Sequence, residues 1–353
     1  MAKSAKKKYV AYVGTYTTGK SEGIHLYDLD TEANQLTLRK VIPCKNASYV
    51  RLSKNKKYLY SIADEGVRVF EVLPDGDLTP FSEIDMDGMR GHHMTSDAAG
   101  RFLFVAGFHD AKLTVIELNE EGNGGHQVSC VYHNRQGGIR DRSWWPHICT
   151  VRMTRDDKYV CAVDDSLNQI VIYRLNKKNG KLTECEIIRM GSDVGPRNLH
   201  FSKDGKFAYV LCEISSTVRV YQVGAQRDGT PDFQLIQEVT TLSNKRDPYD
   251  AAASMRLSDD GSMLMCSSAG DNSVAIFSVD EETGMLSTIV ALPTSGDFPK
   301  DAAFMPDQRH IAVVNNSSNT ITTFAFDVDK HTLVMKGRPQ KVDQPNCILI
   351  KEL

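Results

Sequence analysis

The chain has 353 residues, of which 41% are apolar and 25% are charged, and its formal net charge at pH 7 is −3. This balance is ordinary for a water-soluble globular protein. No basic stripe accompanies it, and no window approaches the roughly 18 consecutive apolar residues of a membrane span. We therefore expect neither nucleic acid nor a membrane among its partners.

The N-terminus is basic, and the apolar segment that follows it, residues 9–13, is far too short for the core of a signal peptide. We expect residues 1–7 to be a solvated tail and the protein to be cytoplasmic. None of the eight cysteines belongs to a Cys-x-x-Cys pair. They are predicted to be free buried thiols rather than a disulfide framework or a zinc site.

A pattern recurs along the chain about every 45–55 residues, a period typical of repeat arrays and propellers. Each copy joins two apolar segments through a tight turn, and the turn residues are commonly Asp, Asn and Gly. The copies lie at residues 49–60, 94–104, 151–160, 199–210, 255–265 and 303–313. Each copy therefore predicts a pair of antiparallel strands.

A third segment with alternating apolar residues follows each pair, and a polar turn then leads to a fourth strand. The third segments lie at residues 67–72, 113–118, 170–175, 218–223, 274–279 and 321–326. Four short antiparallel strands per repeat are typical of a propeller blade. Almost no helical periodicity is present.

The chain termini predict how the ring closes. Residues 8–43 supply the second, third and fourth strands of another blade but no first strand, and residues 346–350 look like a strand with no partner downstream. Joining them completes a seventh blade and removes an open sheet edge. We predict an all-β, seven-bladed β-propeller with four antiparallel strands per blade, a single domain over residues 8–353.

Antiparallel alternation puts two loops of each blade on the same face, next to the central channel. These are the loop that enters the first strand and the loop that joins the second strand to the third. Arg197 and Glu213 occupy these two loops of one repeat, and His147 enters the first strand of the preceding repeat. We expect all three side chains at one mouth of the channel.

The segments Arg142-Ser-Trp-Trp-Pro-His147 and Gly195-Pro-Arg197, with Glu213 downstream, resemble the propeller lactonase family. This family includes bacterial 6-phosphogluconolactonases and fungal carboxymuconate cyclases. The resemblance covers essentially the whole chain, and residues 195–213 carry its most specific part. It implies that His147, Arg197 and Glu213 occupy active-site positions and that Arg142 matches an arginine upstream of the histidine.

Four positions depart from the family pattern. Cys149 and Asn198 stand where the family often has histidine, Lys300 stands where arginine is common, and Ser268-Ala269 replaces a pair that usually ends in arginine. Lysine is a point charge and alanine carries none, so recognition of phosphate or carboxylate by paired arginine hydrogen bonds is weakened.

The resemblance implies hydrolysis of a polar, anionic sugar lactone without a cofactor or metal. His147 would activate water, Arg197 would hold the carbonyl oxygen or an anionic tail, and Glu213 would set their geometry. The residues expected to bind the substrate are Arg142, Asn198, Lys300, Trp145 and His93. The partner is therefore expected to be a small lactone or sugar acid, and the oligomeric state is left open.

Alternatives remain open at this stage. The same scaffold could form a lactone from an unsaturated dicarboxylic acid, or it could be a non-catalytic propeller that binds a sugar acid or a protein. Arg197 and Glu213 could be a purely structural ion pair between blades, and His147 a structural histidine. His92 and His93 could ligate a metal only with a nearby carboxylate, for which the His109-Asp110 pair is the candidate.

Overall fold

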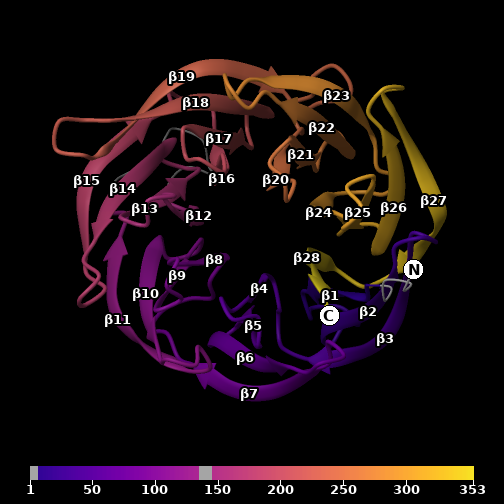
Figure 1. The fold of residues 1–353 in the computed structure, drawn as a ribbon, viewed down its shortest axis with the longest axis horizontal. Coiled ribbons are helices and arrows are strands. Elements are labelled where there is room, and N and C mark those ends of the chain that lie inside the picture. Colours follow the sequence, from indigo (N-terminus) through magenta and orange to yellow (C-terminus); the bar gives the residue numbers. More distant parts are fainter. Residues whose placement is uncertain (1–6, 135–144) are drawn as a thin grey trace, which may run out of the picture.

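A computed structural model describes residues 7–134 and 145–353. All regular structure in these ranges is β-strand, arranged in seven four-stranded antiparallel sheets. The sheets stand around a central channel as the blades of a propeller (Figure 1). Over the same ranges, no helix is long and apolar enough to cross a membrane. The predicted all-β, seven-bladed architecture is confirmed.

We number the blades from the N-terminus and give the strands of each from the channel outward. Blade 1 contains β28 (Pro345–Glu352), β1 (Tyr9–Thr15), β2 (Gly23–Asp30) and β3 (Gln35–Pro43). Blades 2 to 4 contain β4 (Val50–Leu52), β5 (Tyr58–Ala63), β6 (Gly66–Val72) and β7 (Leu78–Ile84); β8 (His93–Ser96), β9 (Phe102–Ala106), β10 (Lys112–Leu118) and β11 (Gly125–Tyr132); β12 (Ile148–Met153), β13 (Tyr159–Asp164), β14 (Gln169–Leu175) and β15 (Leu182–Arg189). Blades 5 to 7 contain β16 (Pro196–Phe201), β17 (Phe207–Cys212), β18 (Thr217–Ala225) and β19 (Pro231–Thr240); β20 (Ala252–Leu257), β21 (Met263–Ser268), β22 (Ser273–Val279) and β23 (Leu286–Pro293); β24 (Pro299–Phe304), β25 (His310–Asn315), β26 (Thr320–Asp327) and β27 (Thr332–Lys341).

The Ser-x-Asp-Gly turn between the first and second strands is built by side chains that bond to the backbone. In blade 5, Ser202 Oγ donates to Asp204 Oδ1 (2.7 Å) and accepts from the Phe207 amide (3.0 Å). Gly205 follows with φ of 78°, a left-handed conformation that glycine adopts without steric cost. The repeated sequence motif therefore specifies the turn locally, before any contact between blades.

The core consists of apolar layers between neighbouring blades. The described residues form seven buried clusters, and each joins two adjacent blades. Second strands such as β13 and β17 are buried along their whole length, because each of their two faces is covered by a different neighbouring blade. Fourth strands such as β27 are mostly exposed. This gradient explains why second strands appear as continuous apolar runs in the sequence.

The C-terminal strand closes the ring. β28 pairs antiparallel with β1, from Tyr9 opposite Glu352 to Thr15 opposite Pro345. The sequence prediction that the C-terminus supplies the missing first strand of blade 1 is confirmed. Residues 1–6 of the predicted tail lie outside the described residues, and Lys7 forms an exposed ion pair with Glu352 (2.8 Å).

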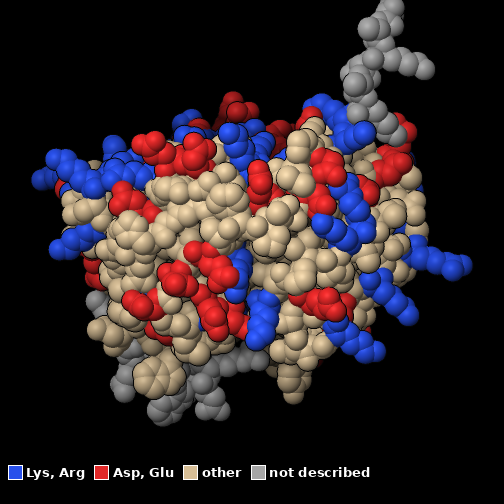
Figure 2. Space-filling model, turned by 90° about the horizontal axis from the view of Figure 1, so that it is seen from below, with Lys and Arg blue, Asp and Glu red and all other residues tan. Residues whose placement is uncertain are grey.

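All eight cysteines are free, as predicted. The expectation that all of them are buried is wrong for Cys130 and Cys185, which are partly exposed because they lie on the outer strands β11 and β15. On the side of the disc seen in Figure 2, basic and acidic side chains are interspersed. That side offers no extended basic surface of the kind that binds nucleic acid.

Candidate functional site

A β-bulge near the start of the innermost strand shapes the channel mouth. In blade 5, Pro196 pairs with Cys212 and Asn198 pairs with Leu211, so that Arg197 is an inserted residue between them. The inserted residues at the equivalent places in blades 4, 6 and 7 are Cys149, Ala253 and Lys300. A bulge redirects the side chain of the extra residue. All four residues line one hollow in the channel.

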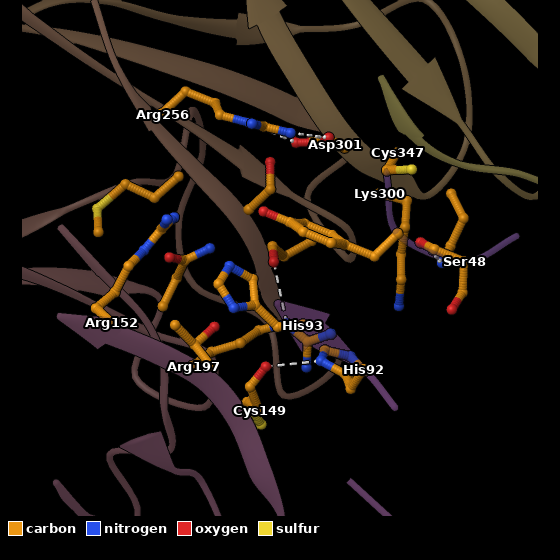
Figure 3. A pocket seen from close by; sticks show the side chains of 17 residues that line it. Ser48, His92, His93, Cys149, Arg152, Arg197, Arg256, Lys300, Asp301 and Cys347 are labelled. Atoms are coloured by element: carbon orange, nitrogen blue, oxygen red, sulfur yellow. Dashed lines mark hydrogen bonds and ion pairs between the residues drawn. The ribbon is translucent and has the colours of Figure 1, made fainter. Parts of the chain in front are cut away.

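The hollow has an empty volume of about 550 Å³, which includes the part open to solvent. Every blade contributes to its wall. One residue from each blade, in order from blade 1, is Asn346, Ser48, His92, Cys149, Arg197, Ala253 and Lys300. In Figure 3 the side chains of Arg197, Lys300 and His92 approach the same space from different blades.

Arg197 and Glu213 form a partly buried ion pair within blade 5. A guanidinium nitrogen of Arg197 donates to Glu213 Oε2, and Arg197 Nε donates to the Ala253 carbonyl of blade 6 (3.0 Å). Burial by itself lowers the pKa of Arg197, but the Glu213 carboxylate raises it above its ordinary value overall. Arg197 is therefore a fixed cation, held by two blades at the channel mouth. Both loops were expected at one mouth of the channel; the two side chains form an ion pair within one blade rather than between blades.

His147 lies beside the hollow rather than in its wall. Cys149, two residues later, occupies the place equivalent to Arg197, because the bulge of blade 4 comes two residues after His147. The His147 ring stacks on Phe108 with centroids 4.1 Å apart. Its Nδ1 is 2.9 Å from Ser166 Oγ and 3.4 Å from a carboxylate oxygen of Asp165.

Asp165 contacts His147 and lies within electrostatic range of Arg197. Burial raises the pKa of Asp165, but hydrogen bonding from His147 and the charge of Arg197 lower it overall. Asp165 is thus a carboxylate at neutral pH, and it favours the tautomer of His147 that carries the proton on Nδ1. Glu213, expected to set the geometry of both residues, contacts Arg197, while Asp165 and Ser166 contact His147.

The pKa values of Lys300 and His92 are both strongly lowered by the position of these side chains in the hollow. Burial, with a further contribution from Arg197, lowers the pKa of Lys300 from 10.5 to about 8. Burial also lowers the pKa of His92 to about 3, with Arg197 and Lys300 acting in the same direction. His92 Nδ1 lies 2.7 Å from the Cys149 carbonyl and donates to it, so the neutral ring presents an unprotonated Nε2.

The other predicted substrate-binding residues divide into three groups. Asn198 and His93 line the hollow, and each has a buried side-chain atom without a partner among the described residues, Oδ1 and Nε2 respectively. Trp145 is 76% exposed and does not line the hollow; it stands in the chain that enters β12. Arg142 lies outside the described residues.

The candidate histidines do not form a metal site with the loop of blade 3. Asp110 accepts from the Met89 and Lys112 amides (2.9 and 3.3 Å), and His92 bonds to the Cys149 carbonyl. In the part of the chain that the structure describes, no group of three or more His, Cys, Asp or Glu side chains could hold a metal ion.

Comparison with known proteins decides the family. A family model described as a lactonase with a seven-bladed β-propeller matches residues 10–350. The chain belongs to this lactonase family. It is 29% identical to the 6-phosphogluconolactonase of Bacillus subtilis, over 97% of this chain and 98% of that protein. It is 28% identical to the 6-phosphogluconolactonase of Formosa agariphila, over 94% and 95% of the two chains.

A solved structure of a candidate 6-phosphogluconolactonase from Bacteroides fragilis is also similar to this lactonase-family chain. It is 26% identical, its TM-score is 0.89, and the match covers 99% of this chain and all of the other. The resemblance to propeller lactonases inferred from the sequence is thereby confirmed.

Sequence reasoning assigned no role to two features of this lactonase-family site. Asp165 lies directly after β13, in the loop between the second and third strands, and this position was the signal that could have identified it as a site residue. The second feature is a group of arginines deeper in the channel. Each of them is the middle residue of an alternating stretch in a first strand, such as Val151-Arg152-Met153, where a charged residue among apolar ones indicates that one face of the strand is not packed.

The low pKa of Lys300 leads to a pH prediction. Lys300 is charged below about pH 8 and neutral above it. If its charge stabilises the anion that forms on the lactone, kcat/KM corrected for spontaneous opening should fall as the pH rises through about 8. Lys300→Arg should move this fall to higher pH, because arginine stays protonated. Lys300→Met should lower kcat/KM and remove the fall. The same descending limb in Lys300→Met would contradict the assignment.

Proposed function

We propose that this protein hydrolyses a polar, anionic sugar lactone at the channel mouth without a cofactor. The observation that carries the proposal is the pairing of two units across the boundary of blades 4 and 5. One is the Asp165–His147 pair, which can accept a proton. The other is the Arg197–Glu213 pair, which presents a fixed positive charge. The match to 6-phosphogluconolactonases along the whole chain supports the same reaction class.

In this mechanism His147 is the general base. Its Nδ1 is engaged by Ser166 and Asp165, so Nε2 takes a proton from water as the water oxygen attacks the lactone carbonyl carbon. The carbonyl oxygen becomes an oxyanion, which Arg197 and Lys300 stabilise electrostatically. The tetrahedral intermediate then collapses, the ring C–O bond breaks, and His147 returns the proton to the departing ring oxygen. The product is the open sugar acid.

The alternative of a non-catalytic binding propeller keeps one observation in its favour. Ala269 stands where the family usually has arginine, and it is buried at 4% exposure, while the neighbouring Ser268 hydroxyl bonds to Thr241 (3.0 Å). This edge of the site therefore supplies no second guanidinium that could donate paired hydrogen bonds to an oxyanion. A sugar acid that raises the melting temperature of a protein without lactonase activity would support the binding role.

An assay on freshly generated 6-phosphogluconolactone tests the enzymatic proposal. The wild-type protein should exceed the spontaneous rate of ring opening, and His147→Asn should lower kcat by about 10²–10⁴-fold, the usual contribution of a general base. His126→Asn is the matched control, because His126 is exposed on the outer strand β11. A wild-type rate equal to the spontaneous rate on phosphorylated and unphosphorylated lactones would refute lactonase activity. Full activity of His147→Asn would refute its assigned role.

A further inference from the structure

A second layer of positive charge lies deeper in the channel than Arg197 and Lys300. Arg51 in β4, Arg152 in β12 and Arg256 in β20 occupy one strand position, three residues after the place of the bulge. These strands belong to blades 2, 4 and 6, so the arginines reach the channel from three directions. Arg152 and Arg256 line the inner part of the hollow, on the side away from Lys300 and His92 (Figure 3). We call Arg51, Arg152 and Arg256 the inner arginines.

Only one of the inner arginines is neutralised by a carboxylate of the described residues. Arg256 binds both oxygens of Asp301 (3.2 and 2.5 Å). Arg152 donates to the Leu199 carbonyl and contacts His200 Nε2, both at 2.9 Å and both uncharged. Arg51 contacts Ser96 Oγ at 3.4 Å, and its Nε is buried without a partner.

The inner arginines also lie within electrostatic range of one another. Burial lowers the pKa of Arg51, and Arg256 contributes in the same direction. Burial lowers the pKa of Arg152 to about 10, with contributions from Arg51 and Arg256. Both groups remain charged at neutral pH. Arg51 and Arg152 are partly buried, and they leave about two positive charges without a carboxylate partner among the described residues.

Neighbouring side chains add uncharged donors that also lack partners. The Val151 amide donates to His93 Nδ1 (3.4 Å), which places the ring proton of the neutral His93 on Nε2. That Nε2 and the Ser48 hydroxyl are buried in the wall of the hollow, and neither has a partner among the described residues. The exposed fractions of His93 and Ser48 are 4% and 7%. His93 and Ser48 thus add two uncharged donors to the guanidinium groups, while the unpaired acceptors of the hollow, Asn198 Oδ1 and Asn346 Oδ1, carry no negative charge.

We propose that the inner arginines, with His93 and Ser48, form a binding site for a doubly charged oxyanion such as a phosphate group. Two uncompensated guanidinium charges match a phosphate, which carries about −1.5 to −2 at neutral pH, better than a single carboxylate. The planar guanidinium of arginine can also donate two parallel hydrogen bonds to the phosphate oxygens. The role in substrate binding rests on the proposed lactonase function: the phosphate of a sugar lactone occupies the inner site while its ring lies at Arg197. The anion site itself does not depend on turnover.

Calorimetric titration with inorganic phosphate at constant ionic strength tests the site directly. Wild-type protein should bind phosphate, and Arg51→Met should bind it at least ~10-fold more weakly, because one charge-assisted contact is lost. Lys336→Met on the exposed outer strand β27 removes the same charge and should leave the affinity unchanged. Absence of phosphate binding by the wild type, or equal affinity of Arg51→Met, would overturn the proposal. If Arg51→Met does not fold, the wild-type titration and Arg51→Lys replace it. Arg51→Lys keeps the charge but loses the paired hydrogen bonds of the guanidinium, so it should bind phosphate more weakly than the wild type, and equal affinity would overturn the proposal.

Lactone kinetics then distinguish free phosphate from an esterified one. Arg51→Met should raise KM for 6-phosphogluconolactone by about tenfold and leave KM for unphosphorylated gluconolactone unchanged. Equal effects on both lactones would overturn the role of the site in substrate binding. If neither lactone is hydrolysed by the wild type, the proposed function fails, and the phosphate titration still decides whether the anion site exists.

Discussion

Arg197→Ala is expected to lower kcat/KM for a lactone substrate by about 10²–10³-fold, the usual effect of removing one oxyanion donor. Arg197 is the cation held most firmly at the channel mouth, because it bonds both to Glu213 and to the Ala253 carbonyl of the next blade. Its removal also takes the guanidinium away from the partly buried Glu213 carboxylate and should lower the free energy of unfolding. Steady-state kinetics and chemical denaturation of the same preparation separate the two effects.

Another arginine of blade 5 provides the matched control. Arg219 pairs with Glu238 (2.5 Å) between the outer strands β18 and β19, away from the channel. Arg219→Ala should retain wild-type kcat/KM. A folded Arg197→Ala with wild-type kcat/KM would show that the Arg197–Glu213 pair is only structural. A double-mutant cycle with Glu213→Gln should show strongly non-additive effects, since the two residues act as a unit.

Deletion of residues 345–353 is expected to abolish cooperative folding. These residues include β28, which gives blade 1 its innermost strand and buries Cys347 and Ile348 to 3% and 1% exposure. Loss of a single buried aliphatic side chain costs about 2–5 kcal/mol. Whole proteins are stable by only about 5–15 kcal/mol. The deletion also opens the edge of β1, which invites aggregation.

Circular dichroism and thermal melts of the soluble fraction measure this effect. A synthetic peptide of residues 345–353 should restore part of the native signal when it is added to the truncated chain. Val334→Ala on β27, where Val334 is 52% exposed, is the control and should change stability by no more than about 0.5 kcal/mol. A truncated protein that melts cooperatively at the wild-type temperature would show that ring closure does not need β28.

Most of the fold follows from local patterns. The alternating third strands and the Ser-x-Asp-Gly turns specify hairpins by chemistry within a few residues, and their sixfold recurrence predicts the blades. Closure by the C-terminus follows from an unpaired strand at one end and an incomplete blade at the other. The burial of cysteines was harder to predict, because an outer strand such as β15 carries apolar residues without being covered.

The site was predicted less completely. Arg197 and Glu213 meet as expected because both belong to one blade, whose strand order fixes their separation. His147 was expected at the position equivalent to Arg197, but the bulge of blade 4 places Cys149 there. A bulge inserts one extra residue into a strand and so shifts the positions beside it by one residue, and no sequence pattern reliably predicts it.

The sequence alone therefore determined the strand order, the number of blades and the face on which the charged loops gather, because these depend on turns and periodicity within each repeat. Tertiary structure decided which side chains share a space. The charge of Arg197 acts on the Asp165–His147 pair once blades 4 and 5 pack together, and the inner arginines of blades 2, 4 and 6 converge only when the ring closes. Residues about 100 positions apart become neighbours around a channel, and no local pattern encodes that distance.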